Sequence, residues 1–389
     1  MKICFVSDTI GVIGGQQKIL TIIANSLAQN KKNEISILFN QNEKLSRTIK
    51  YPLDPKVKTY WTKETAHGKY DYILSRLYTK CYQRGFGSGS QDFNLNRIFP
   101  LKERRSYIKF FETHQFDIIV GVAPYSSALL GMISNQLTSK TVGWLHNSYE
   151  RYFEYKDNLY NLKSIYKIAL KKLDSRIVLT KSAKRRFTSE FDMDFDYIYN
   201  PLTFKTSKFS TLKKKKIIFV GRIFYATKGL DLLLEIVQKL KKINSNFEVE
   251  VVGDGPDMQR FQSDIEKNNL QSYITIVGES NNVAEHYLDS SIFISTSKVE
   301  GFGLVLTEAM ECGLPVVSFS TEGPSEIIIQ NKSGFLVNNY NTKEFAEKLD
   351  ILLKNDKLRS DMGAFSKQRA NDFSLKVITE DWETLFNSL

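Results

Sequence analysis

The sequence predicts an α/β protein with two doubly wound, parallel-sheet domains. Its 389 residues exceed what one ordinary core accommodates, and they fit two domains of about 150–200 residues each. Short apolar segments alternate with helical patterns along the chain, which is typical of parallel sheets covered by helices. Glycine-rich turns follow apolar segments in both halves, so each half presents strand ends that a ligand can approach closely.

The expected strands fall into two sets. In the first half they are residues 2–7, 34–39, 57–61, 117–121, 141–145 and 176–179. In the second half they are residues 216–220, 248–252, 273–277, 291–295, 315–319 and 335–337. A long helical region separates the third strand from the fourth, and its glycine- and serine-rich residues 85–90 predict a loop. Asn200-Pro201 marks the crossover, so we expect domains at 1–200 and 201–373 and a final helix at 374–389.

The most informative motif is Glu300-Gly-Phe-Gly-Leu-Val-Leu-Thr-Glu308. An apolar run precedes it and a helical pattern follows, which indicates a strand, a glycine-rich loop and a helix. The backbone N–H groups at such a helix N-terminus bind anions. Glu308 lies about one turn into the helix, and two carboxylates at an anion site fit a ligand that also carries hydroxyl groups, such as a sugar nucleotide. A loop with two solvated glutamates is the alternative for this pair taken alone.

Three glycine turns support the same interpretation. Gly221-Arg-Ile-Phe-Tyr-Ala-Thr-Lys-Gly229 follows an apolar run, and its Arg222 and Lys228 suit a diphosphate. A surface turn with two solvated cations is the alternative. Val251-Val-Gly-Asp-Gly-Pro256 places Gly253 at another strand end, and Gly11-Val-Ile-Gly-Gly15 places Gly15 after the first strand.

With these motifs the chain resembles glycosyltransferase family 4, a group of retaining, nucleotide-sugar-dependent transferases with the GT-B fold. The resemblance covers nearly the whole length and includes His146 in Gly143-Trp-Leu-His-Asn147 and the segment Glu322-Gly-Pro-Ser-Glu326. The chain departs from the usual pattern in one place, because the spacing from Arg222 to Lys228 is one residue longer. The resemblance implies two Rossmann-like domains facing across a cleft, with the last helix returning to the N-terminal domain.

The resemblance also implies a role for each motif. Arg222 and Lys228 would bind the donor diphosphate, Glu300 would lie beside the donor sugar, and His146 would contact the transferred sugar; these four are the implied catalytic residues. A structural histidine at a strand end is the alternative for His146. Glu308 would accept hydrogen bonds from the ribose. The implied donor-binding residues are Gly15, Arg222, Lys228, Gly253, Gly301, Phe302, Gly303, Leu304 and Glu308.

The implied function is retaining transfer of a hexose or N-acetylhexosamine from a nucleotide sugar, with uridine as the expected base. The implied acceptor is lipid-linked or a saccharide, in the synthesis of bacterial surface polysaccharide such as capsule or lipopolysaccharide. Two alternatives stay open: a sugar-nucleotide epimerase of GT-B fold and a non-catalytic sugar-nucleotide-binding module. We expect no cofactor and no metal, because the four histidines are scattered and no cysteine pair has metal-ligand spacing.

The excess charge of the chain lies in its first half. Residues 1–200 hold 31 Lys and Arg against 18 Asp and Glu, whereas residues 201–389 hold 23 against 25. Basic clusters at 102–109, 163–172 and 181–186 are interleaved with aromatic residues, which is typical of helices that lie on an anionic membrane. Solvated helix faces are the alternative, and nucleic acid is not expected because no recognition motif accompanies the charge. We expect a cytoplasmic protein without a signal peptide, with peripheral contact to the inner face of the plasma membrane as an open possibility.

Overall fold

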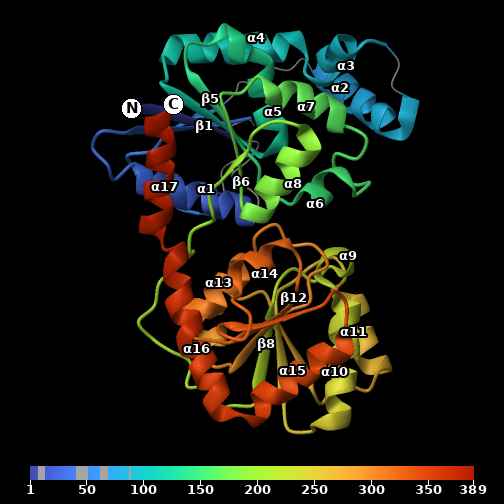
Figure 1. Cartoon of the computed structure of the whole chain (residues 1–389). Coiled ribbons are helices and arrows are strands. Elements are labelled where there is room, and N and C mark those ends of the chain that lie inside the picture. The colour runs from blue at the N-terminus through green and yellow to red at the C-terminus, as the bar shows by residue number, and fades with distance from the viewer. Residues whose placement is uncertain (8–13, 41–50, 62–68, 87–88) are drawn as a thin grey trace. The chain divides into compact units, whose positions relative to one another are not determined.

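The computed structural model describes residues 1–7, 14–40, 51–61, 69–86 and 89–389. The chain forms two compact units (Figure 1). Unit 1 comprises Met1–Pro201 together with Leu375–Leu389, and unit 2 comprises Leu202–Ser374. Most of the predicted glycine loop at 11–15 lies outside the described residues, as do residues 87–88 of the predicted loop at 85–90.

Unit 1 is built on a seven-stranded, fully parallel sheet with the order β3-β2-β1-β4-β5-β6-β7. Its strands are β1 (Lys2–Ser7), β2 (Glu34–Phe39), β3 (Lys58–Trp61), β4 (Ile118–Val122), β5 (Lys140–Trp144), β6 (Ser175–Val178) and β7 (Asp196–Tyr197). The central strands are buried over residues 3–7 of β1 and along the whole of β4, because helices cover both faces of the sheet. The strand order reverses between β1 and β4.

The helices of unit 1 surround this sheet. They are α1 (Gly15–Leu27), α2 (Lys69–Cys81), α3 (Gln91–Ile98), α4 (Leu101–His114), α5 (Ala123–Ile133), α6 (Tyr149–Phe153), α7 (Lys163–Lys171), α8 (Lys181–Phe191) and α17 (Leu375–Ser388). Part of the predicted loop at 85–90 is instead a π-helical turn at Tyr82–Phe86, in which Gly85 has a φ of 86°. Glycine adopts such a positive φ without strain, so the turn can bend there.

The last helix, α17, completes the core of unit 1. Figure 1 shows α17 beside α1, and the Oγ of Ser26 on α1 lies 2.8 Å from the Oγ1 of Thr379 on α17. Trp382 is fully buried, with its ring centroid 4.7 Å from that of Trp144 and 6.4 Å from that of Phe5. A large aromatic from the far end of the chain therefore packs against strands β1 and β5.

Unit 2 contains a six-stranded parallel sheet with the order β10-β9-β8-β11-β12-β13. Its strands are β8 (Lys216–Val220), β9 (Glu248–Val252), β10 (Ile274–Gly278), β11 (Ile292–Ser295), β12 (Val316–Phe319) and β13 (Gly334–Val337). Its helices are α9 (Tyr225–Lys228), α10 (Leu230–Ile243), α11 (Met258–Lys267), α12 (Val283–Leu288), α13 (Leu304–Glu311), α14 (Glu322–Ile327), α15 (Thr342–Lys354) and α16 (Asp356–Ala370). The strand order reverses between β8 and β11.

The predicted fold class, two doubly wound parallel α/β sheets, is confirmed. Each strand expected from the sequence is present, with ends that differ by at most one residue. The short strand β7 was not predicted, because its two residues are too few to show an apolar pattern. In the described part of the chain, no helix combines the length and the apolar character needed to cross a bilayer.

Candidate functional site

The predicted donor motifs converge at the place where the strand order of unit 2 reverses. Strands β8 and β11 are neighbours in the sheet, with Ile217 opposite Ile292. The connection after β8, which includes the short helix α9, carries Arg222 and Lys228, and the loop after β11 carries Glu300. In open α/β sheets, ligands bind outside the carboxyl ends of the strands at such a reversal point. The fold therefore brings two distant sequence motifs to the usual ligand position.

The centre of this site is an ion pair. The Nζ of Lys228 lies 2.6 Å from the Oε2 of Glu300, and the two side chains are 20% and 17% exposed. The Oγ of Ser297 lies 3.3 Å from the same carboxylate oxygen. Because both partners remain partly accessible, a bound anion can compete for the lysine and a bound hydroxyl can compete for the glutamate.

Two hydrogen bonds to backbone carbonyl groups hold the segment of Lys228 against the segment that leads to Glu300. The Thr296 hydroxyl donates to the carbonyl oxygen of Lys228 at 2.8 Å, and the amide of Lys298 donates to the carbonyl oxygen of Thr227 at 2.8 Å. Gly229 has a φ of 60°, and a Cβ at this position would lie 2.2 Å from the carbonyl oxygen of Thr296. Only glycine fits both the conformation and the close approach. Gly229 therefore helps to hold the preceding residue, Lys228, in its position.

Arg222 is the second cation predicted for the site. Its side chain is exposed, and no described residue makes a hydrogen bond or ion pair with its guanidinium. The loop that carries it is tightly held: the amide of Ile223 donates to the carbonyl oxygen of Asp254 at 2.9 Å. An unpaired, forked cation on a fixed loop is suited to a diphosphate, which it can bind through two parallel hydrogen bonds.

Gly253 lets the loops after β8 and β9 approach each other. Its φ is +143°, and a Cβ at this position would lie 2.0 Å from the carbonyl oxygen of Gly221. The amide of Gly221 donates to the carbonyl oxygen of Val252 at 3.0 Å, so the strand pairing continues into the loops. Gly253 therefore allows the close packing of the loop that carries Arg222. The sequence predicts Gly253 as a donor-binding residue but does not reveal this packing contact.

Helix α13 begins inside the second motif. Gly303 precedes it with a φ of 104°, the helix starts at Leu304, and no side chain caps this end. Its first turn contains no acidic residue, so the positive end of the helix dipole is not neutralised from within the helix. Gly301 and Phe302 are buried, and the Phe302 ring packs edge-to-face on Phe373 at 5.7 Å. The side chain of Phe302 therefore anchors the loop, and only its backbone can serve a ligand.

Glu308 lies in the middle of α13 and is only 6% exposed. The Tyr287 hydroxyl donates to its Oε2 at 3.2 Å, and the Thr203 hydroxyl donates to its Oε1. Burial and the neighbouring Glu308 raise the pKa of Tyr287 well above its usual value, so the phenol keeps its proton for this hydrogen bond. Two donors on opposite oxygens fix the orientation of the carboxylate.

Sequence reasoning missed several residues of this site. Thr203 and Tyr287 carry no motif, because their proximity to Glu308 arises only from the tertiary fold. Gly323 follows β12, and its amide donates to the carbonyl oxygen of Glu300 at 3.0 Å. A Cβ at Gly323 would lie 2.0 Å from the carbonyl oxygen of Phe302. The glycine in Glu322-Gly-Pro-Ser-Glu326 was the available signal for this contact.

His146 and Gly15 belong to unit 1. His146 follows β5, and its ring packs on that of Trp144 with centroids 4.1 Å apart. Burial lowers the pKa of His146 to about 3, so its imidazole is neutral at physiological pH. The ring Nε2 is buried and has no partner among the described residues. Gly15 is the first residue of α1. A neutral imidazole suits a hydroxyl group better than a phosphate as a ligand.

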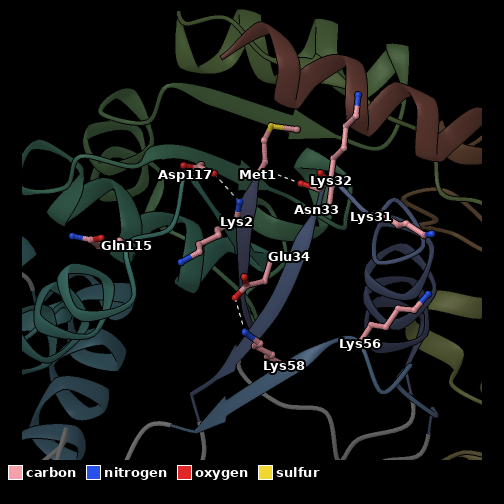
Figure 2. Close-up of a pocket in the computed structure, with 10 residues that line it drawn as sticks. All are labelled: Met1, Lys2, Lys31, Lys32, Asn33, Glu34, Lys56, Lys58, Gln115 and Asp117. Atoms are coloured by element: carbon pink, nitrogen blue, oxygen red, sulfur yellow. Dashed lines mark hydrogen bonds and ion pairs between the residues drawn. The ribbon is translucent and has the colours of Figure 1, made fainter.

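A separate hollow of about 660 Å³ lies at the end of the unit 1 sheet where its strands begin (Figure 2). Figure 2 shows it around the amino ends of β1, β2 and β3, away from the carboxyl ends where ligands of such sheets usually bind. Its lining residues are Met1, Lys2, Lys31, Lys32, Asn33, Glu34, Lys56, Lys58, Gln115 and Asp117. Lys58 pairs with Glu34 at 2.7 Å. None of the predicted site residues lines this hollow.

Comparisons with known proteins show that the chain is similar to glycosyltransferases. Residues 203–369 match the family model described as Glycosyl transferases group 1, which covers nearly all of unit 2. An uncharacterized glycosyltransferase of Haemophilus influenzae is 26% identical over 386 residues, spanning 98% of this chain and 99% of the relative. The poly(ribitol-phosphate) α-N-acetylglucosaminyltransferase of Staphylococcus aureus is 32% identical over 231 residues, which cover 56% of this chain and 44% of that enzyme.

The fold has a solved counterpart. A crystal structure of a variant of S. aureus TarM, in complex with fondaparinux, α-GlcNAc-glycerol and UDP, matches with a TM-score of 0.77 at 18% sequence identity. The match covers 99% of both chains. The chain therefore has the GT-B fold of that structure, and the family match lies within its second unit.

Proposed function

We propose that this protein is a retaining glycosyltransferase of family 4. It transfers a hexose or N-acetylhexosamine from a nucleotide sugar, most simply a UDP-sugar, to a lipid-linked or saccharide acceptor in the synthesis of bacterial surface polysaccharide. The observation that carries this proposal is the Lys228–Glu300 ion pair, which lies where the strand order of unit 2 reverses. Exposed Arg222 lies on the same β8–α10 connection as Lys228.

The cations of the site match the charge that develops during transfer. When the bond between the sugar C1 and the diphosphate oxygen breaks, negative charge accumulates on the departing nucleotide. Arg222 and Lys228 would stabilise this charge, because fixed cations lower the barrier where charge develops. The acceptor oxygen forms its bond to C1 on the same face, and its proton passes to the departing phosphate oxygen. One bond to C1 breaks as the other forms on the same face, so the reaction needs no protein nucleophile.

The ion pair gives Glu300 a second role. The carboxylate of Glu300 accepts a hydrogen bond from Lys228 at 2.6 Å. A diphosphate that attracts Lys228 would release a carboxylate oxygen, which could then accept hydrogen bonds from the donor sugar. The backbone at the start of α13 would donate to the same ligand. Glu308, oriented by Tyr287 and Thr203, would accept from the ribose hydroxyls.

The relatives support the donor and the stereochemistry. The TarM structure contains UDP, which is the nucleotide that a UDP-sugar leaves behind. The S. aureus relative forms an α-N-acetylglucosaminyl product according to its name. Transfer from an α-linked donor with retention gives an α product. His146 stays a prediction as a contact to the transferred sugar, and its neutral imidazole fits a hydroxyl partner.

A donor panel tests the proposal. The purified chain is incubated with UDP-, GDP- and dTDP-linked hexoses and N-acetylhexosamines, with and without a lipid-linked saccharide acceptor, and nucleotide release is measured. We expect acceptor-dependent release from one donor class and an α-linked product by NMR. Release of a C2- or C4-epimeric sugar without acceptor would identify an epimerase. Donor binding without any turnover across the panel would identify a binding module, and either result would overturn the proposal.

A further inference from the structure

Helix α2 exposes apolar side chains to solvent. Its apolar residues Ile73, Leu74 and Leu77 are 52%, 55% and 54% exposed. Spacings of one, three and four residues place these three side chains on one side of the helix. Single exposed leucines are ordinary on protein surfaces, but several on one helix face indicate an interaction surface.

Two polar residues of α2, Ser75 and Tyr78, face α3 instead. The Ser75 hydroxyl donates to the carbonyl oxygen of Ile98 at 2.9 Å, and the Tyr78 hydroxyl donates to the Oδ1 of Asn94. Both partners lie on α3, which Figure 1 shows beside α2. Hydrogen bonds therefore fix the orientation of α2 on α3, and rotation of the leucines toward the core would break them.

The exposed apolar side chains continue onto the neighbouring helices. Phe93 on α3 is 44% exposed and Leu101 at the start of α4 is 50% exposed. Together with Leu74 they line a shallow hollow of about 440 Å³, whose rim includes Arg97 and Lys102. We refer to the exposed residues Ile73, Leu74, Leu77, Phe93 and Leu101 as the α2–α3 face.

The charge around the α2–α3 face is predominantly positive. The described cations Arg76, Lys80, Arg84, Arg97 and Lys102 are all exposed. Residues 73–102 contain these five cations and a single acidic residue, Asp92. Two copies of the chain meeting through this face would bring like charges together. The charge pattern therefore favours an anionic occupant over self-association.

Two of the basic clusters expected to contact a membrane lie next to acidic residues, unlike most cations around the α2–α3 face. In the cluster at 163–172, Lys163 pairs with Glu190 at 2.5 Å. In the cluster at 181–186, Lys184 pairs with Asp196 at 2.6 Å and Arg186 with Glu190 at 3.1 Å. Acidic neighbours thus neutralise part of both clusters. The α2–α3 face instead combines exposed cations with exposed apolar side chains.

We propose that the α2–α3 face docks on an anionic phospholipid membrane, with Leu74 and Leu77 entering the headgroup region and the surrounding cations contacting lipid phosphates. Apolar insertion and electrostatic attraction together give stable but reversible binding of amphipathic helices. This inference deepens the proposed function, since a transferase acting on a lipid-linked acceptor must reach the membrane surface. Membrane contact is inferred only from the exposed apolar residues of the α2–α3 face and the cations around it, and not from the proposed reaction.

Vesicle co-sedimentation of the full-length chain tests the proposal. The vesicles contain phosphatidylcholine alone or with 30% phosphatidylglycerol, an amount chosen to give a clear surface charge. We expect binding to the anionic vesicles only, with strong weakening at 1 M salt, where the Debye length is about 3 Å. The double variant Arg76→Gln/Lys80→Gln should bind about 25-fold more weakly, at about fivefold for each cation near the surface. The variant Leu74→Ser/Leu77→Ser should lose at least about tenfold.

The matched control removes the same charge elsewhere in unit 1. Lys31→Gln/Lys32→Gln changes two exposed lysines of the hollow in Figure 2 and should leave binding within about twofold of the unmodified chain. Equal losses in this control and in Arg76→Gln/Lys80→Gln, with no loss in the leucine variant, would show diffuse electrostatic attraction and overturn the proposal. Concentration-dependent dimers that the leucine variant abolishes would assign the face to a second copy and would also overturn it.

The chain carries its own reporter for this experiment. Cys81 at the end of α2 is exposed, whereas Cys4 and Cys312 are buried with raised thiol pKa values. A polarity-sensitive fluorophore on Cys81 should therefore label one position and shift to the blue on anionic vesicles. No shift on vesicles that do bind the chain would place the contact elsewhere. Nucleotide release with a water-soluble acceptor should be unchanged in the leucine variant, so failure of membrane docking and failure of the transferase proposal give separate results.

Discussion

The ammonium group of Lys228 lies 2.6 Å from the carboxylate of Glu300, although 72 residues separate them in the chain. The contact joins the loop after β8 to the loop after β11, which are adjacent because the two strands pair. Each charge neutralises the other in this ion pair. A diphosphate therefore gains less from Lys228 than from Arg222, since it must first displace Glu300.

This difference predicts distinct effects of removing each cation. Arg222→Ala should weaken donor binding and lower turnover, by about 1.5–3 kcal/mol for a charge-assisted contact, and leave the unfolding free energy unchanged. Lys228→Ala should also weaken the donor contact, and in addition it leaves the carboxylate of Glu300 without its cation. Donor titration calorimetry and urea unfolding measure the two quantities.

Lys239→Ala is the matched control for both variants. It removes a partly exposed lysine that pairs with Glu235 at 2.8 Å on α10, in the same unit but outside the two loops. Such an exposed pair contributes at most about 1 kcal/mol to stability. Unchanged donor affinity in Arg222→Ala would remove that residue from the donor site.

Substitutions of the two glutamates of the motif should have different effects on the steady-state parameters KM and kcat. Glu308→Ala should chiefly raise the donor KM, because its partner is the ribose, far from the reacting bond. Glu300→Ala should chiefly lower kcat, because its partner is the reacting sugar. Initial rates over a range of donor concentrations give both parameters. Equal changes of kcat and KM in both variants would contradict this division of roles.

The hydrogen bonds that orient Glu308 should affect the donor KM. Tyr287→Phe removes the donor to Oε2 and leaves the buried ring in place. Its donor KM should rise several-fold, corresponding to about 0.5–1.5 kcal/mol for one hydrogen bond, while kcat changes little. The conservative Thr203→Ser variant keeps the second donor to Glu308 and should keep its KM. A kcat loss in Tyr287→Phe that exceeds the KM change would argue against a positioning role.

His146 should make stability depend on pH. Its pKa is about 3 in the folded chain and about 6.5 when unfolded, so the unfolded chain binds the extra proton first. The stabilising effect of the neutral imidazole is complete above pH 6.5 and is lost as pH falls, at up to about 1.4 kcal/mol per pH unit. Urea unfolding of the wild type and of His146→Asn between pH 7.5 and 5 measures it. Parallel pH profiles for the two proteins would refute the assignment.

Glycine substitutions should distinguish backbone conformation from close packing. Gly278 has a φ of +86°, and no described atom lies within 4 Å of a Cβ built there, so Gly278→Ala should lose only about 1–2 kcal/mol. Gly253→Ala should lose clearly more, because its Cβ would lie 2.0 Å from the backbone oxygen of Gly221. Thermal unfolding compares the two variants, and similar losses would mean that the loops separate easily.

Most of the fold could be predicted because its signals are local. Most strands have an apolar run of their own, and glycines such as Gly253 and Gly303 mark turns in unit 2. Two short loop motifs also identified Lys228 and Glu300, which the structure joins in one ion pair. Parallel-sheet rules place the loops of paired strands side by side.

The remaining features depend on tertiary packing. Thr203 lies 105 residues before Glu308, and neither its type nor its neighbours distinguish it from other threonines. The same holds for the orientation of α2. Periodicity shows that Leu74 and Leu77 share a face with Ile73, but only the hydrogen bond from Ser75 to α3 shows that this face points outward.

The position of Trp382 also determines when unit 1 can finish folding on the ribosome. Its core includes Phe5 and Trp144, yet Trp382 is translated only after all of Leu202–Ser374 has been made. At about 5–20 residues per second, the sheet of unit 1 waits on the order of ten to thirty seconds for its last aromatic. During that interval Trp144 lacks this partner, so a nascent chain arrested before α17 should be recognised by chaperones that bind exposed aromatic surface.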